Sequence, residues 1–316
     1  MPENVLDKLV QEGSTYEGWP SYSCFCNCRV DLVGGLRRRG YGGGATRTKV
    51  TGQGFIANFY HTDDSQKKLG IVVLGGSDGG KPDRLAAALA DQGYPVLSLA
   101  YFKVEGTPEY LDMIPLEYFD KPIAWLENSE KIRKAMIAVV GASKGAELAL
   151  LLASRKPQVR GVIAIAPSSV VWQGIPKTFW PPRSSWSLGG QQLPFVPYVF
   201  SKGSNPNDLF GLYRQSLMQK EQVQKAAIEV EKIGGPILLL SGQQDNLWPS
   251  AEMGDMICKR LKESQFKYNY EHVTYDAAGH TLNEHYMLGG TSDGNKRARE
   301  ESTKRMLEFL NAMEVE

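Results

Sequence analysis

The chain lacks long apolar runs, an excess of charge of either sign, and a leader-like beginning. None of its apolar runs approaches the ~20 residues of a transmembrane helix, so we expect no membrane insertion. Its 36 Lys and Arg residues nearly balance its 35 Asp and Glu residues, and this balance predicts no nucleic-acid partner. The first residues show neither the basic stretch nor the apolar core of a secretory signal. These absences favour a cytoplasmic protein.

Cysteine is scarce, at four residues in a chain of 316. Three of them form one tract, Cys24, Cys26 and Cys28, and the fourth is Cys258. A large core in a reducing compartment does not use a disulfide scaffold, and no His-rich segment or second cysteine pair stands near the tract. We therefore interpret the tract as free thiols and predict neither a metal site nor a cofactor.

The chain divides into an N-terminal arm and one larger domain. Residues 1–48 are polar and rich in glycine, with three consecutive arginines at 37–39, and they show no helical or strand period. We predict a flexible arm there. Residues 49–316 show alternating apolar strand and helix patterns. The expected strands cover 54–60, 70–74, 95–100, 136–140, 162–166, 237–240 and 268–275, and the expected helices cover 82–92, 115–127, 144–155 and 293–312.

This alternation predicts an α/β fold with a mostly parallel central sheet and helices on both faces. One stretch, at about 168–215, departs from the pattern because it is irregular and rich in tryptophan, tyrosine, phenylalanine and proline. Long irregular insertions in compact domains are uncommon unless they are functional or disordered, and the aromatic content argues against disorder. We interpret the stretch as a cap, lined with apolar side chains, over an active site.

The most informative motif is Gly141-Ala142-Ser143-Lys144-Gly145. It follows the buried strand at 136–140 and opens a helix, which is the context of a nucleophile elbow. Such a turn lifts a serine hydroxyl above the sheet edge, and the glycines allow strand and helix to approach closely. The alternative is a plain helix N-cap serine.

A serine nucleophile needs a base, and His280 is the candidate because it lies just beyond the strand at 268–275. His285 is the reserve base. Asp245, directly after the strand at 237–240, is the carboxylate expected to orient the imidazole, with Asp276 and Glu252 as rivals. The order Ser143, then Asp, then His is the chain order of the α/β-hydrolase fold.

The same chemistry needs two N–H donors for an oxyanion. The backbone of Lys144, the residue after the serine, is expected to supply one. The glycine-rich loop at 75–80 is expected to supply the other, and by position Ser77 is the candidate. A phosphate-binding loop is the alternative, but its G-x-x-x-x-G-K-[ST] pattern is absent.

Several segments together resemble one known family. They are Gly-Gly-Ser-Asp-Gly-Gly at 75–80, Leu-Ala-Tyr-Phe at 99–102, Ile-Pro-Leu-Glu-Tyr-Phe at 114–119, Gly-Ala-Ser-Lys-Gly-Ala-Glu-Leu-Ala-Leu at 141–150, Ala-Pro-Ser-Ser-Val-Val-Trp-Gln-Gly at 166–174 and Ala-Gly-His at 278–280. From about residue 50 to 312 the chain resembles the C-terminal domain of acyl-CoA thioester hydrolases and bile-acid-CoA:amino-acid N-acyltransferases. The resemblance implies a Ser-Asp-His triad and an acyl-thioester substrate.

Two departures from the family pattern matter. Larger members carry a β-sandwich of ~100 residues before this domain, and the ~50 residues found here are too few for one. The acyltransferase branch uses cysteine as nucleophile, whereas position 143 is serine. An acyl-serine ester is less reactive towards amines than a thioester, so hydrolysis is favoured over acyl transfer.

The sequence thus predicts an acyl-CoA thioesterase, a serine hydrolase that works on a small-molecule substrate. Trp172 and Trp248 are expected to help bury the acyl chain. The Lys144 side chain or the arginines at 37–39 are candidates for the CoA phosphates, although we favour a solvated surface for each. The oligomeric state and the acyl chain length are not predicted.

Three other functions compete with this one. A carboxylesterase or dienelactone-hydrolase-like enzyme would use the same triad on oxygen esters. A peptidase usually brings a large extra domain to restrict access, and none fits here. A non-catalytic binding protein on this fold would typically have lost a member of the triad, and all three members are present.

Overall fold

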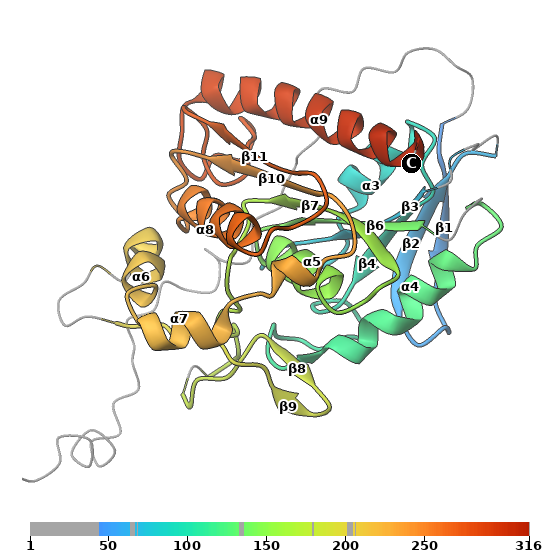
Figure 1. The fold of residues 1–316 in the computed structure, drawn as a ribbon. Coiled ribbons are helices and arrows are strands. Elements are labelled where there is room, and N and C mark those ends of the chain that lie inside the picture. The colour runs from blue at the N-terminus through green and yellow to red at the C-terminus, as the bar shows by residue number, and fades with distance from the viewer. Residues whose placement is uncertain are drawn as a thin grey trace, which may run out of the picture.

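The structure of the chain is a computed structural model that describes residues 44–63, 67, 69–132, 136–178, 180–200, 205 and 207–315 (Figure 1). The predictions for the arm up to residue 43, with its three cysteines and its arginines at 37–39, lie outside the described residues.

The core of the molecule is an eight-stranded sheet in the order β1-β2-β4-β3-β6-β7-β10-β11. β1 and β2 run antiparallel at one edge, and from β4 to β11 every neighbouring pair is parallel. The predicted mostly parallel sheet is therefore confirmed. The strands are β1 Thr46–Val50, β2 Ile56–His61, β3 Leu69–Leu74, β4 Val96–Ala100, β6 Met136–Ala142, β7 Val159–Ile165, β10 Ile237–Gly242 and β11 Tyr270–Tyr275.

Helices cover both faces of this sheet, as predicted (Figure 1). α3 (Asp83–Ala90) and α9 (Ser292–Val315) pack on one face, and α4 (Asp120–Glu127), α5 (Lys144–Ala153) and α8 (Ser250–Glu263) pack on the other. Successive side chains of a strand point to opposite faces, so an entirely apolar strand serves both layers. In β3, Val72 contributes to one buried cluster and Val73 to the other.

Between β7, which ends at Ile165, and β10, which begins at Ile237, the described residues add no strand to this sheet. This segment includes the stretch at 168–215 that we interpret as a cap, and it is called the cap below. The cap contains β8 (Trp186–Leu188), β9 (Gln191–Gln192), α6 (Leu209–Ser216), α7 (Lys220–Ala226) and the 3-10 turn η2 (Val230–Lys232). β8 also pairs with β5 (Ile114–Pro115), which leads into the 3-10 helix η1 (Leu116–Phe119). The cap is thus joined to the sheet domain by a small second sheet.

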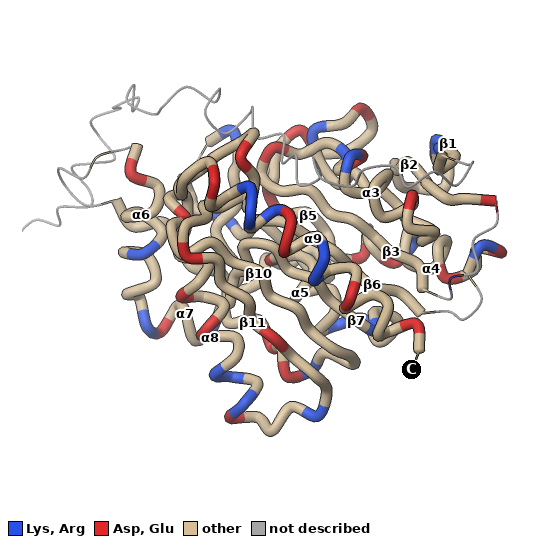
Figure 2. Tube along the Cα trace, turned by 90° about the horizontal axis from the view of Figure 1, so that it is seen from above, with Lys and Arg blue, Asp and Glu red and all other residues tan. Residues whose placement is uncertain are grey.

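Acidic and basic residues are interspersed along the described part of the chain (Figure 2). This mixture agrees with the formal net charge of +1. None of the helices in the described ranges has the length and apolar character needed to cross a membrane.

One ion pair fastens α9 to the loop at 276–291, which connects it to β11. Arg299 of α9 forms a two-pronged pair with Glu284, with N–O distances of 2.8 and 2.6 Å. The side chains are only 5% and 12% exposed. Hydrogen bonds from Arg299 lower the pKa of Glu284 from 4.5 to about 2.

We predict that Glu284→Gln lowers the free energy of unfolding at neutral pH by about 2 kcal/mol, because it leaves a buried guanidinium without its carboxylate. The folded-state pKa of Glu284 is depressed, so its contribution is complete above pH 4.5 and is lost as the pH falls towards 2. The variant should therefore lose less stability than the parent over that range. Urea unfolding as a function of pH measures both effects.

Glu271→Gln is the matched control. Glu271 makes a similar two-pronged pair with Arg305 of the same helix, but these side chains are 43% and 44% exposed. Its loss should therefore cost under about 1 kcal/mol. Equal losses in the two variants would contradict the role given to Arg299.

Candidate active site

Ser143 stands in the sharp turn between β6 and α5, as the motif predicted. Its backbone angles are φ 57° and ψ −123°, a strained conformation for a residue other than glycine. The amide N–H of Ser143 donates to the Ile165 carbonyl over 2.8 Å, which fixes the turn against β7. This serine is therefore held in a strained turn and is not a plain N-cap, since its side chain makes no capping hydrogen bond.

The turn depends on two positions without side chains. A Cβ atom on Gly141 would overlap the Gly145 carbonyl, and one on Gly145 would overlap the carbonyls of Gly75 and Leu74. The start of α5 therefore lies directly against the loop that follows β3. Gly76, the next residue of that loop, is so close that its Cβ would be 3.2 Å from the Ser143 Cβ.

His280 and Asp245 meet beside this edge of the sheet. His280 Nδ1 lies 2.8 Å from Asp245 Oδ2, and the side chains are 3% and 2% exposed. An ionised carboxylate only accepts hydrogen bonds, so Nδ1 carries the proton and Nε2 is left as the basic nitrogen. Nε2 is buried and has no hydrogen-bond partner among the described residues.

Asp245 is itself firmly held. Its Oδ1 accepts the backbone N–H groups of Leu247 (2.9 Å) and Trp248 (3.1 Å). Its Oδ2 accepts the Ser250 hydroxyl over 2.6 Å in addition to His280. These donors fix the direction of the carboxylate.

The rival residues lie elsewhere. Asp245 is the carboxylate bonded to His280, whereas Asp276 is exposed and Glu252 faces Arg214 over 3.6 Å. The side chain of His285 is 61% exposed. The structure therefore brings Asp245 and His280 together and leaves the reserve residues on the surface.

The loop at 75–80 passes Ser143 at the end of β3. Ser77, its predicted oxyanion donor, is half-buried, one residue beyond the close contact at Gly76. Its neighbour Asp78 adds a carboxyl group that the sequence argument did not use, and burial raises the pKa of Asp78 to about 6. The backbone of Lys144 begins α5 on the other side of Ser143.

The Lys144 side chain corrects an expectation. We favoured a solvated surface, with CoA phosphates as the alternative, but the ammonium is 1% exposed and lies 2.8 Å from Glu147 Oε2. Burial lowers the pKa of Lys144 and raises that of Glu147, and the attraction between the two charges opposes both shifts. The side chain turns inward because Glu147, one helical turn later, offers it a buried partner.

Glu147 also binds the cap. Its Oε1 accepts the indole N–H of Trp186 over 2.7 Å and the backbone N–H of Trp172 over 3.1 Å. Sequence reasoning missed this residue, as it missed Ser250. The available signal was a lone acidic residue inside the apolar run 146–153.

The two tryptophans predicted to meet substrate are both buried. Trp248 is 1% exposed, and its ring stands edge-on to His280 with centroids 5.7 Å apart. Trp172 is fully buried and packs edge-on against Tyr213, 4.8 Å away, which in turn contacts Trp248. Both indole N–H groups have no hydrogen-bond partner among the described residues.

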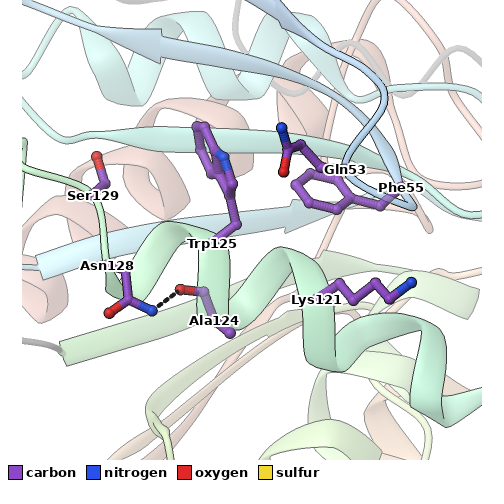
Figure 3. Close-up of a pocket in the computed structure, with 7 residues that line it drawn as sticks. All are labelled: Gln53, Phe55, Lys121, Ala124, Trp125, Asn128 and Ser129. Atoms are coloured by element: carbon purple, nitrogen blue, oxygen red, sulfur yellow. Dashed lines mark hydrogen bonds between the residues drawn. The ribbon is translucent and has the colours of Figure 1, made fainter.

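A separate open pocket of about 560 Å³ lies along α4 (Figure 3). Trp125 and Phe55 form its apolar part, and Lys121, Gln53 and Asn128 contribute polar groups. None of the predicted site residues lines it.

Comparison with known proteins bears on the family and the fold. The fold and the strained serine define an α/β-hydrolase. Residues 114–312 match the family described as BAAT / acyl-CoA thioester hydrolase C terminal, and the chain belongs to that family. The resemblance stated from the sequence is thereby confirmed.

Two curated relatives are acyl-coenzyme A thioesterases from Mus musculus. Acyl-coenzyme A thioesterase 6 is 30% identical over 219 residues, which cover 69% of this chain and 49% of the relative. Acyl-coenzyme A thioesterase 2, mitochondrial, is 28% identical and is covered over 46% of its length. The chain thus spans about half the length of these relatives, and one relative is mitochondrial, so the cytoplasmic location stays a prediction.

Solved structures agree on the fold. An esterase from Pyrococcus furiosus, Pf2001, superposes with a TM-score of 0.52 at 15% identity, over 85% of this chain and 91% of the esterase.

We predict that Gly145→Ala lowers the free energy of unfolding by about 1–3 kcal/mol, because the new methyl group meets two backbone carbonyls that cannot turn away. Helix propensity alone would favour alanine by up to about 1 kcal/mol, so the sign of the change tests the contact. Gly44→Ala is the control, since its Cβ would meet nothing within 4 Å. Chemical denaturation that finds Gly145→Ala neutral or stabilising would contradict the close approach.

Proposed function

We propose that the chain is a serine-type hydrolase of acyl thioesters, acting on acyl-CoA through Ser143, Asp245 and His280. The observation that carries the proposal is the buried 2.8 Å pair of Asp245 and His280, which leaves His280 Nε2 unpartnered. Asp245 follows β10 and His280 follows β11, at the sheet edge where β6 ends in the strained Ser143. Membership of the thioester hydrolase family favours the thioester over other acyl compounds.

The first half of the proposed reaction forms an acyl-enzyme. His280 Nε2 takes the hydroxyl proton as Ser143 Oγ attacks the acyl carbonyl carbon. The backbone N–H groups of Lys144 and Ser77 are the proposed donors to the oxyanion that forms. When the C–S bond breaks, His280 returns the proton to the thiolate, and CoA leaves as the free thiol.

The second half releases the acid. Water loses a proton to His280 as its oxygen attacks the acyl-serine ester, and His280 then protonates Ser143 Oγ as the ester bond breaks. Asp245 keeps the imidazole in one tautomer and offsets its positive charge during both halves. No metal or organic cofactor takes part in the proposed steps.

We further propose that Trp248 borders the place of the acyl group, since its ring stands beside His280. Trp172 packs against Tyr213, and Tyr213 packs against Trp248. The apolar cluster of the cap around them suits a hydrocarbon chain better than a charged group.

We predict that the protein releases free thiol from acyl-CoA substrates and that Ser143→Ala lowers kcat by at least ~10³-fold, because the nucleophile is lost. His280→Asn should have a comparable effect, and His285→Asn, which changes an exposed histidine, should stay within about twofold. A thiol-reactive dye assay on a series of acyl chain lengths measures this. Equal losses at His280 and His285 would remove the assigned base.

The same variants on p-nitrophenyl esters decide the leaving group. The proposal expects kcat/KM for the best acyl-CoA to exceed that for the matching oxygen ester. If the protein cleaves only the oxygen esters and this cleavage still depends on Ser143, the proposed triad stands. The protein would then be a carboxylesterase and not a thioesterase.

A further inference from the structure

Tyr101, the residue after β4, contacts the loop at 75–80 through its side chain. Its hydroxyl donates to the Gly75 carbonyl over 2.6 Å, and the side chain is 1% exposed. Burial raises the pKa of Tyr101 well above its ordinary value, and the negative charges of Asp78 and Glu147 add to the effect. The phenol therefore remains a hydrogen-bond donor at every pH at which the enzyme would work.

The Gly75 carbonyl is held from two sides. Tyr101 donates to it, and the start of α5 lies against it at Gly145, where a Cβ would overlap the oxygen. Gly76, the next residue, is the one that approaches the Ser143 Cβ. Any shift of the carbonyl would therefore move the loop relative to the nucleophile.

Tyr101 is in turn connected to the start of α5. Its ring packs against Trp186, with centroids 5.9 Å apart. The Trp186 indole N–H donates to Glu147 Oε1, and Glu147 Oε2 binds the Lys144 ammonium. A buried path of contacts thus runs from the loop at 75–80 to the residue that follows Ser143.

We infer that Tyr101 is a positioning residue. It holds the 75–80 loop and the start of α5, which together form the proposed oxyanion hole, at a fixed separation. The inference rests on the proposed function. Oxyanion donors act on charge that develops only in the transition state, so their misplacement lowers kcat and leaves substrate binding intact. A residue that served stability alone would not produce this division between kcat and KM.

The test is Tyr101→Phe beside Tyr118→Phe. Tyr118 is a matched control because its hydroxyl also donates to a backbone carbonyl, that of Ala100, over 2.6 Å. We expect Tyr101→Phe to lower kcat for thiol release about tenfold with KM within twofold, less than the ~10²–10³-fold loss of a whole oxyanion donor. Tyr118→Phe should leave both constants within twofold, and thermal unfolding should show comparable stability losses.

A second measurement does not depend on turnover. Ser143 Oγ adds to the carbonyl carbon of a trifluoromethyl ketone that carries the best acyl chain, and the hydroxyl proton passes to His280 Nε2. The carbonyl π electrons move to the ketone oxygen, which becomes an oxyanion in the same hole. The affinity for the ketone should fall by about the same factor as kcat in Tyr101→Phe and stay unchanged in Tyr118→Phe. If Tyr101→Phe does not fold, Trp186→Phe replaces it in the test, because this variant removes the indole donor to Glu147. We expect Trp186→Phe to lower kcat and the affinity for the ketone about threefold, with KM unchanged.

The outcomes separate the inference from the function beneath it. If Ser143-dependent turnover is present but Tyr101→Phe keeps its kcat, or loses activity only through KM, Tyr101 has no positioning role and the hydrolase stands. The same conclusion follows if both tyrosine variants lose kcat equally. If the parent shows no Ser143-dependent turnover, the proposed function fails and the inference falls with it.

Discussion

The close approach of α5 to the end of β3 is the constraint on which the site depends. It exists because Gly145 carries no side chain where the Gly75 and Leu74 carbonyls lie. Ser143, with its positive φ, lies in the same turn, and Gly76 of the 75–80 loop lies beside it. The strain at one residue is tolerated because two parallel strands, β3 and β7, hold the turn on either side.

The buried pair of Lys144 and Glu147 extends this constraint into the cap. Burying two charges costs several kcal/mol per ion, and their attraction offsets this only when the remaining lone pairs are satisfied. Trp186 and Trp172 supply those further donors, and both belong to the cap. The pair is therefore stable only while the cap is seated, so the ionic contact specifies where the cap sits rather than adding much stability.

Sequence patterns predicted the sheet, and they placed Ser143, Asp245 and His280 after strand ends, because both inferences follow from local rules. The triad itself stays a prediction. A short apolar run such as 70–74 that ends in glycines favours a buried strand, and Ser143, Asp245 and His280 each follow a strand at the same edge. Glu147 and Ser250 were not predicted, since their partners lie 39 and 5 residues away in chain segments of irregular path. The helix α7 was also not predicted, because it is short and polar and its burial depends on tertiary contacts.

Two sets of contacts of different origin thus hold the residues of the candidate site. Asp245 and His280 are held by strand ends and by the loop amides of Leu247 and Trp248, within the sheet domain. The cap is held to α5 by hydrogen bonds that converge on one carboxylate, that of Glu147. The ring of Trp186, a cap residue, also packs against Tyr101. Cap residues that avoid these contacts can therefore change the shape of the cap without disturbing the contact between Asp245 and His280. Changes at the contacts themselves would alter the position of the cap.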